Sequence, residues 1–336
     1  MTTTAVKTLR LGHSPDPDDA FMWYPLADFV GPDGKQYKPL IDTAGYQFQH
    51  VLEDIQALNE RSFRGELEIT AISIHTYPYV SDKYALTSCG ASLGDGYGPM
   101  IVTADPNFDP ANLIRQTDAS KTGAHGRIID PGDSDNQQAT LAIPGKQTSA
   151  WLATQLWLKE TLGLALDQRG GGQSPIPHEV VAFDQIIDKV AAGEYAAGLI
   201  IHEGQLTYTD HHLQQVVDLG QWWGQTRSLP LPLGGNCIRR DLGQPAMNVV
   251  CDVLKRSIEY ALQHRDEAVR FALNWARGIE DDLADRFVGM YVNEWTLDYG
   301  QDGRAAVRQF LREGIDAGLV PDCGDIDFIE PRPKDA

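Results

Sequence analysis

Short apolar runs alternate with amphipathic, helix-like stretches along most of this chain, and this alternation limits the possible folds more than any other feature. Strands that alternate with helices are typical of α/β proteins with a mostly parallel sheet. The strand-like runs are residues 9–12, 68–74, 99–103, 140–143, 179–183 and 196–201, and the helix-like stretches are 20–26, 50–63, 150–162 and 184–192. The sequence therefore predicts an α/β fold.

The length of the chain and the order of its segments predict two α/β lobes. A chain of 336 residues is longer than one hydrophobic core usually serves. We expect the first lobe to comprise residues 1–103 and 230–336, and the second lobe to comprise 104–229. Residues 105–137 are rich in Asp, Gly, Asn and Ser without periodicity, which indicates a surface insertion in the second lobe. A first lobe that is interrupted and then resumes resembles the plan of the type 2 periplasmic binding proteins, whose ligand lies in the cleft between the lobes.

Charge and cysteine content narrow the classes of partner. The formal net charge of -19 argues against binding to nucleic acid or to an anionic membrane, although backbone amides at helix N-termini can still bind a small anion. The N-terminal residues lack the apolar core of a signal peptide, and no apolar run is long enough to span a membrane. We therefore expect a cytoplasmic protein. The scattered cysteines form no CxxC pair and indicate neither a zinc site nor a disulfide framework; they are Cys89, Cys237, Cys251 and Cys323.

His202 is the first candidate for chemistry. It ends the apolar run 196–201, which reads as a buried strand. Ligands of open α/β sheets lie beyond the carboxyl ends of the strands, and an imidazole there can take and return a proton near neutral pH. The structural alternative is a histidine that only bonds a neighbouring loop. Glu203 would not orient His202, because adjacent residues of a strand point to opposite sides.

Two further segments follow strand-like runs and should converge with His202 on the cleft. Ser14 precedes an acidic, proline-containing turn that is typical of a helix start. We expect Ser14 to contact the substrate; the alternative is that its hydroxyl only caps the helix. Ala71, Ile72 and Ser73 end another strand, and the Ser73 hydroxyl is a plausible ligand contact. His75, which follows, is expected to be structural.

A glycine-containing turn at 145–149 resembles an anion-binding turn. Gly145 permits a tight bend, and Thr148 and Ser149 stand where a helix would begin with unpaired amides. The carboxylate of a small ligand would suit such a site. The alternative is a plain helix cap.

The segments singled out so far, together with several others in the same order, resemble the 1,4-dihydroxy-6-naphthoate synthases of the futalosine route to menaquinone. The resemblance covers nearly the whole chain outside 105–137 and a Gly-rich stretch at 168–177. It is carried by LRLGHSPDPDDAF at 9–21, CGASLGDGYGP at 89–99, IPGKQTSA at 143–150, AGLIIHE at 197–203, VVDLGQWW at 216–223, LPLPLGG at 229–235 and YVN at 291–293.

This resemblance implies a periplasmic-binding-protein fold used as a cytoplasmic enzyme without a metal or redox cofactor. Such an enzyme converts cyclic dehypoxanthine futalosine to 1,4-dihydroxy-6-naphthoate and releases dihydroxyacetone, which makes it a carbon–carbon lyase acting on a small-molecule carboxylate. By residue matching, His202 takes the position of the catalytic base. Ser73 with its neighbours Ala71 and Ile72, and Thr148 with Ser149, take positions that contact the substrate. The oligomeric state is not implied.

The first turn departs from the pattern of these synthases, which is Ser-Pro-Cys-Pro-Asn-Asp-Thr-Phe. This chain has Asp16, Asp18 and Ala20 where the pattern has Cys, Asn and Thr. The two added charges would disfavour a carboxylated ligand unless they face solvent or are paired. Two alternatives therefore stay open: a binding protein for small acids without catalysis, and chorismate dehydratase, a related enzyme of the same pathway. The Ile-Ile-His-Glu segment at 200–203 favours the naphthoate synthase.

Overall fold

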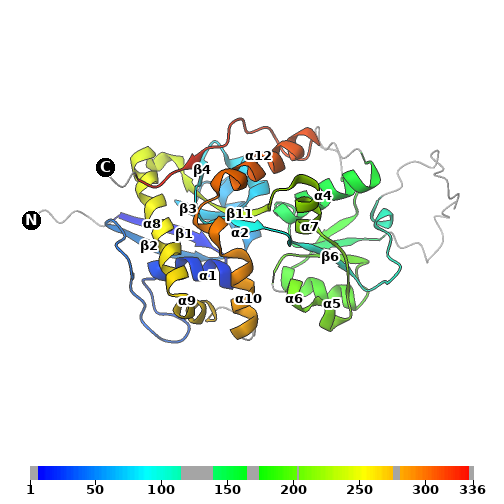
Figure 1. Ribbon diagram of the computed structural model, residues 1–336, viewed down its shortest axis with the longest axis horizontal. Coiled ribbons are helices and arrows are strands. Elements are labelled where there is room, and N and C mark those ends of the chain that lie inside the picture. The colour runs from blue at the N-terminus through cyan, green and yellow to red at the C-terminus, as the bar shows by residue number, and fades with distance from the viewer. Residues whose placement is uncertain (1–6, 115–138, 165–173, 203, 275–280, 333–336) are drawn as a thin grey trace, which may run out of the picture.

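The chain folds around two β-sheets, which lie one beside the other along its longest axis (Figure 1). The computed structural model describes residues 7–114, 139–164, 174–202, 204–274 and 281–332. In this part of the chain the helices are α1 (Pro17–Trp23), α2 (Ile55–Phe63), α3 (Tyr77–Val80), α4 (Ser149–Leu162), α5 (Ile186–Ala191), α6 (Gly204–Thr207), α7 (Leu219–Arg227), α8 (Gln244–Gln263), α9 (Arg265–Ala272), α10 (Asp281–Tyr291), α11 (Glu294–Leu297) and α12 (Gly300–Asp316).

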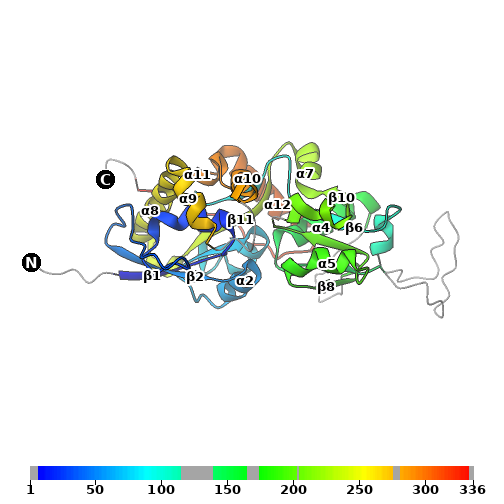
Figure 2. The ribbon, with the colours of Figure 1, turned by 90° about the horizontal axis from the view of Figure 1, so that it is seen from below.

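The first sheet has seven strands, with the order β12-β4-β11-β3-β1-β2 and with β5 paired to β11. The strands are β1 (Lys7–His13), β2 (Tyr46–Leu52), β3 (Ile69–Ser73), β4 (Tyr84–Thr87), β5 (Ser92–Gly94), β11 (Leu231–Arg239) and β12 (Phe328–Ile329). Strand β1 runs parallel to β2 and β3, whereas β11 runs antiparallel to β3, β4 and β5. Helices α8, α9 and α10 lie on one side of the sheet and α2 on the other (Figure 2).

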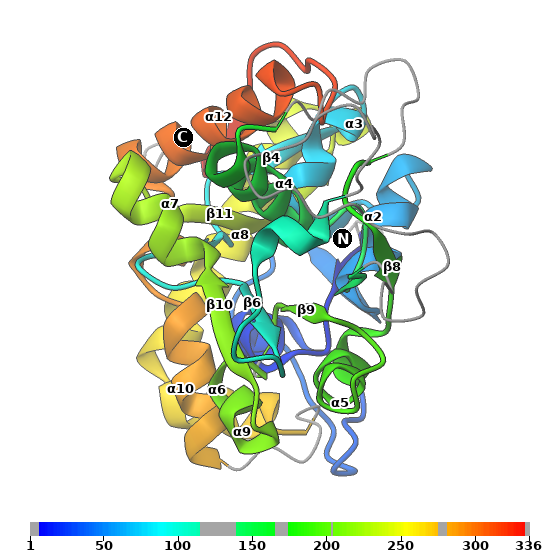
Figure 3. The ribbon, with the colours of Figure 1, turned by 90° about the vertical axis from the view of Figure 1, so that its right-hand side faces the viewer.

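The second sheet has five strands in the order β10-β6-β9-β7-β8. They are β6 (Met100–Thr103), β7 (Leu141–Ile143), β8 (His178–Val180), β9 (Ala197–Ile200) and β10 (Gln214–Asp218). Helices α4 and α7 cover one face and α5 the other (Figure 3). Strand β7 is parallel to β8 and β9, but β6 is antiparallel to β9 and β10. Both sheets therefore contain parallel and antiparallel pairs of strands. The alternation of strands and helices had predicted a mostly parallel sheet, and that prediction is wrong.

One hydrophobic core continues from the first sheet into the second. Its buried members include Ile72 on β3, Trp151 on α4, Leu199 on β9 and Phe310 on α12. Helix α12 packs against both β11 and α4, so it bridges the two sheets. A separate core on the other side of the first sheet joins β1 to α1, α8 and α9.

The helix expected at 50–63 is shorter than the sequence indicated. Residues 46–52 form strand β2, which pairs along its full length with β1, and the helix begins only at Ile55. Asp54 caps it by accepting from the backbone N–H groups of Gln56 and Ala57. Because β2 lies at the edge of the sheet, several of its residues are exposed and its apolar pattern is weak.

The chain changes from one sheet to the other at two places, at 95–99 between β5 and β6 and at 228–230 between α7 and β11. We propose that the two lobes divide at these crossings. The second crossing agrees with the expected boundary near 230. The first precedes the expected boundary at 103, because β6 pairs within the second sheet.

Of the expected insertion at 105–137, residues 105–114 are described and include a short 3-10 turn at Pro110–Leu113. The remainder lies outside the described residues. Among the helices that the structure describes, none has both the length and the apolar character needed to cross a membrane.

Candidate active site

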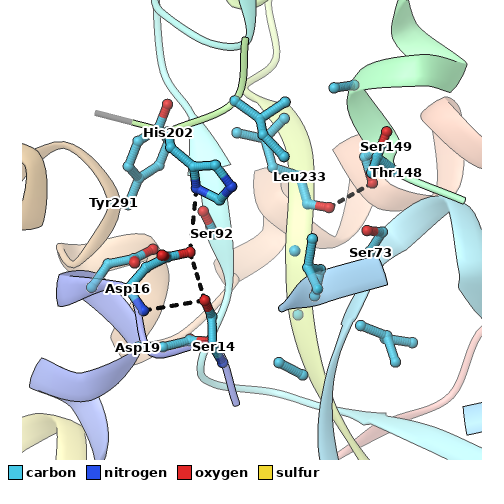
Figure 4. A pocket seen from close by; sticks show the side chains of 18 of the residues that line it. Ser14, Asp16, Asp19, Ser73, Ser92, Thr148, Ser149, His202, Leu233 and Tyr291 are labelled. Atoms are coloured by element: carbon cyan, nitrogen blue, oxygen red, sulfur yellow. Dashed lines mark hydrogen bonds and ion pairs between the residues drawn. The ribbon is translucent and has the colours of Figure 1, made fainter. Parts of the chain in front are cut away.

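A pocket lies between the two sheets, at the ends of strands that come from both of them (Figure 4). It spans about 780 Å³ when the part open to solvent is included. Every site residue named from the sequence lines it: Ser14, Ala71, Ile72, Ser73, Thr148, Ser149 and His202. Residues that the sequence did not single out as contacts also line it, among them Asp16, Asp18, Asp19, Ser92, Leu233, Asn236 and Tyr291.

His202 stands just beyond the end of β9, where the second sheet meets the first turn of the chain. Its Nδ1 lies 3.2 Å from Oδ2 of Asp16, and the two side chains are only 15% and 14% exposed. The ring of Phe183 packs against the imidazole with the ring centres 4.0 Å apart. The second ring nitrogen, Nε2, is turned away from Asp16 toward the space beside Leu233 (Figure 4). The arrangement leaves Nε2 free to face a ligand.

Asp16 occupies the N-cap position of α1, but its carboxylate does not cap the helix. It accepts a hydrogen bond from the Ser14 hydroxyl at 2.5 Å, and the same hydroxyl oxygen accepts from the Asp16 backbone N–H at 3.1 Å. Pro17, at the first helical position, needs no acceptor for a backbone N–H. The Asp16 carboxylate is thereby fixed between Ser14 and His202.

Two more carboxyl groups, Asp18 and Asp19, stand beside Asp16. Burial raises the pKa of Asp19 to about 7; a hydrogen bond from the Ser14 backbone N–H at 2.7 Å opposes this rise, and the charge of Asp16 adds to it. Burial, together with the charges of Asp19 and Asp16, also raises the pKa of Asp18 well above its usual range. Part of this cluster is therefore protonated near neutral pH, which reduces the repulsion that three carboxylates would exert on an anionic ligand.

Thr148 and Ser149 form the N-terminal end of α4, and their hydroxyl groups are engaged within the protein. Thr148 Oγ1 accepts from the Trp151 backbone N–H at 3.2 Å and donates to the Gly145 carbonyl at 2.9 Å, which makes it the helix cap. Ser149 Oγ donates to the Leu233 carbonyl at 2.5 Å and accepts from the His75 backbone N–H at 3.2 Å. The groups that remain for a ligand are the first backbone N–H groups of α4, which have no acceptor within the helix.

Ser73 is held at the end of β3 by a residue of α2. Asn59 donates through Nδ2 to Ser73 Oγ at 3.0 Å and accepts from the Ser73 backbone N–H at 2.9 Å. Because Ser73 Oγ accepts this bond, its own proton can be donated to a ligand. Ala71 and Ile72 line the pocket beside it, opposite Gly235 and Asn236 of β11.

His75 contacts Thr148 and Ser149 and has a structural environment. It is buried, and Nδ1 is 3.1 Å from the Thr148 carbonyl. Burial lowers the pKa of His75 to about 4, although the bond to Thr148 opposes the shift. His75 is therefore neutral at physiological pH.

A group of three or more His, Cys, Asp or Glu side chains placed to hold a metal ion is absent from the described part of the chain. The carboxylates of the first turn instead bond to Ser14 and to His202.

A family model described as "Menaquinone biosynthesis" matches residues 9–315. The chain belongs to this menaquinone biosynthesis family. Two curated relatives are each named "1,4-dihydroxy-6-naphtoate synthase". The one from Streptomyces coelicolor is 32% identical over 94% of this chain and 96% of its own, and the one from Thermus thermophilus is 33% identical over 94% and 97%.

Solved structures show the fold. A crystal structure of a protein from Archaeoglobus fulgidus is 34% identical, covers 94% of this chain and 100% of that one, and has a TM-score of 0.74. A Candida albicans protein described as having the generic periplasmic binding protein fold matches with a TM-score of 0.58 at 10% identity, over 98% of this chain and 99% of that one. The expected periplasmic-binding-protein fold is confirmed.

Three features of this family member's pocket were missed from the sequence. The contact of Asp16 with His202 was not foreseen, although Asp16 had been noted as a departure from the synthase pattern. Asn59, which bonds to Ser73, was also missed; the one indication in the sequence is that it is a polar residue on the buried face of α2. Tyr291 lines the pocket and donates to Gln205 Oε1 at 3.0 Å; its signal was the matching segment at 291–293.

Proposed function

We propose that this protein is a 1,4-dihydroxy-6-naphthoate synthase, which converts cyclic dehypoxanthine futalosine to 1,4-dihydroxy-6-naphthoate and dihydroxyacetone. The observation that carries the proposal is the position of His202. In a chain of the menaquinone biosynthesis family, this histidine presents a free Nε2 to a pocket between two lobes. The relatives that bear the name of this synthase match 94% of the chain.

The reaction begins with His202. Nε2 takes a proton from the sugar-derived part of the substrate, and the electron pair left behind drives elimination and cleavage of a carbon–carbon bond. The three-carbon fragment leaves as dihydroxyacetone, and Nε2 returns the proton as the products form, which regenerates the neutral imidazole. The electron pair of the broken carbon–carbon bond stays with the bicyclic product, whose ring system becomes aromatic. The step therefore does not need an electron acceptor from the protein. The proposed enzyme is thus a cofactor-independent lyase.

The remaining walls hold the substrate. Its ring carboxylate fits the N-terminal end of α4, where unpaired N–H groups and the helix dipole favour an anion. Ser73, fixed by Asn59, can donate to a substrate oxygen. This places the carboxylate away from Asp16, Asp18 and Asp19 and orients the sugar-derived part toward His202. We infer a cytoplasmic enzyme with a small-molecule carboxylate substrate.

The proposal is tested by incubating the purified protein with cyclic dehypoxanthine futalosine, after dialysis against EDTA and with no cofactor added. We expect dihydroxynaphthoate and dihydroxyacetone in equal amounts by liquid chromatography and mass spectrometry. Saturable binding of the substrate without product would instead identify a binding protein. Turnover of chorismate to a dehydrated product, with none of the futalosine derivative, would identify a dehydratase.

A further inference from the structure

We propose that Asp16 is a positioning residue for His202: it holds the imidazole in the tautomer that leaves Nε2 free as the base, and it stabilises the imidazolium formed during turnover. The inference rests on the proposed function, in which His202 removes the substrate proton. It concerns a residue in which this chain differs from the synthase pattern, because that pattern has cysteine at position 16.

The contact itself supports this role. Asp16 Oδ2 is 3.2 Å from His202 Nδ1, and both side chains are largely withdrawn from solvent. Charges in such a place are less screened by water and salt than charges on the surface. Asp16 comes from the turn before α1 and His202 from the turn after β9, so the contact also joins the two lobes (Figure 4).

Asp16 is itself held in place. The Ser14 hydroxyl donates to the same Oδ2 at 2.5 Å, and the Asp16 backbone N–H returns a bond to that hydroxyl at 3.1 Å. A carboxylate fixed in this way does not have to be reorganised when the imidazole becomes charged. On the other face of His202, the ring of Phe183 restricts rotation of the imidazole.

Two neighbouring carboxyl groups, Asp18 and Asp19, share the acidic turn with Asp16. The pKa of Asp19 and that of Asp18 are both raised, and the charge of Asp16 contributes to each rise. These two neighbours therefore hold protons more readily than free carboxyl groups do, which limits the negative charge that surrounds the Asp16–His202 contact.

The chemistry of the pair follows from proton balance. A neutral imidazole has one N–H, and a carboxylate at Nδ1 selects the form with the proton on Nδ1 and the lone pair on Nε2. During the reaction the substrate's proton moves to Nε2, while its bonding electron pair stays on the substrate. The imidazolium then donates from Nδ1 to Asp16, which stays ionised and does not receive the proton.

Asp16→Asn tests the inference, because the amide has nearly the same shape but no charge and can equally donate to Nδ1. We expect kcat to fall by about 10- to 1,000-fold with KM changed less than about threefold. This is less than the roughly 10⁴-fold loss when the buried carboxylate partner of a serine protease's histidine is neutralised, because both side chains here are partly exposed. Asp302→Asn, an exposed carboxylate on α12, is the matched control and should keep wild-type kcat.

Nitrogen NMR of protein labelled with ¹⁵N-histidine gives a readout that a purely structural role of Asp16 would not change. With the His202 signals assigned from their loss in His202→Ala, the wild type should show the Nδ1–H tautomer. Asp16→Asn should show a mixture or the Nε2–H form. An unchanged tautomer, or unchanged kcat in an active enzyme, overturns the inference. If the wild type does not turn over the substrate, the proposed function fails, and the NMR result still decides whether Asp16 sets the tautomer.

Ser14→Ala provides a second variant if Asp16→Asn does not fold. It removes the hydroxyl that holds the carboxylate and keeps the charge. We expect kcat to fall by about three- to tenfold, with KM unchanged. A raised KM with unchanged kcat would overturn the positioning role and identify Ser14 as a substrate contact.

Discussion

Two histidines, His202 and His75, each contact a residue of the other lobe, but of the two only His202 lines the pocket, and their surroundings give them different properties. His202 faces the carboxylate of Asp16, whereas His75 faces the backbone carbonyl of Thr148. A carboxylate stabilises the charged form of an imidazole, but a buried carbonyl does not compensate for the loss of water. Both residues follow the end of a strand. The comparison shows that burial and the contacting group, rather than the position at the end of a strand, separate a candidate base from a structural histidine.

The largest effect is expected from His202→Ala. Loss of a general base reduces turnover by about 10²- to 10⁴-fold, and because His202 lines the pocket rather than the core, the melting temperature should change by only a few degrees. Steady-state kinetics and thermal denaturation of the same preparation measure both. His211→Ala is the matched control, since His211 also contacts an aspartate, Asp188 at 3.3 Å, but on the surface. Full activity of folded His202→Ala would show that His202 is not the base, so that it would not differ from the structural His75 in function.

His75→Asn tests the other side of the comparison through the pH dependence of stability. An exposed histidine has a pKa of 6.5, and burial lowers the pKa of His75 to about 4. Between these values the unfolded state binds the extra proton, so the wild type loses stability as the pH falls. Between pH 7 and pH 5, His75 should lower the free energy of unfolding of the wild type by about 2 kcal/mol.

In His75→Asn the amide can still donate to Thr148. From pH 7 to pH 5 the free energy of unfolding of this variant should therefore fall by about 2 kcal/mol less than that of the wild type. Urea unfolding at the two pH values gives the difference. His211→Asn, which alters an exposed histidine, should reproduce the wild-type dependence. Equal pH dependence of wild type and His75→Asn would show that His75 is not held neutral by burial.

Ser73→Ala tests whether the Ser73 hydroxyl binds the substrate rather than taking part in the chemical step. Loss of one donor to the substrate should raise KM by about tenfold, with kcat changed less than twofold. Ser81→Ala, in the same lobe and outside the pocket, should leave both constants unchanged. A fall in kcat without a rise in KM would instead show that the Ser73 hydroxyl acts in the chemical step.

The smallest effect is expected from Thr148→Val. Loss of the helix cap should lower the free energy of unfolding by about 1 kcal/mol, and Thr148→Ser should restore it. KM should change by less than twofold, because the hydroxyl is already bonded to Gly145 and accepts from Trp151. A KM effect larger than that of Ser73→Ala, without a loss of stability, would assign the hydroxyl to the substrate.

Much of the fold could be predicted because it depends on local patterns. The buried strands β3, β7 and β9 are short apolar runs, and their ends were placed to within two residues. Strand β2 was missed because an edge strand exposes much of its surface. The antiparallel direction of β6 and β11 could not be predicted from local sequence, since it depends on how the chain crosses between the lobes.

The candidate site divides in the same way. Convergence of four segments on one pocket could be predicted, because each follows a strand or begins a helix at the same edge. The contact between Asp16 and His202 could not be predicted, because the two residues meet only across the cleft. Nor could the sequence show that the hydroxyls of Thr148 and Ser149 are bonded within the protein, since Ser149 bonds to the distant Leu233 and His75.

The hydrophobic core that continues from β3 through α4 to α12 has a thermodynamic consequence for the whole molecule. Domains joined only by linkers can melt separately, but units that share buried side chains lose them together. Neither lobe can expose its part of this core without removing packing partners from the other. Heating should therefore produce a single cooperative transition, in which the pocket and both lobes are lost at one temperature.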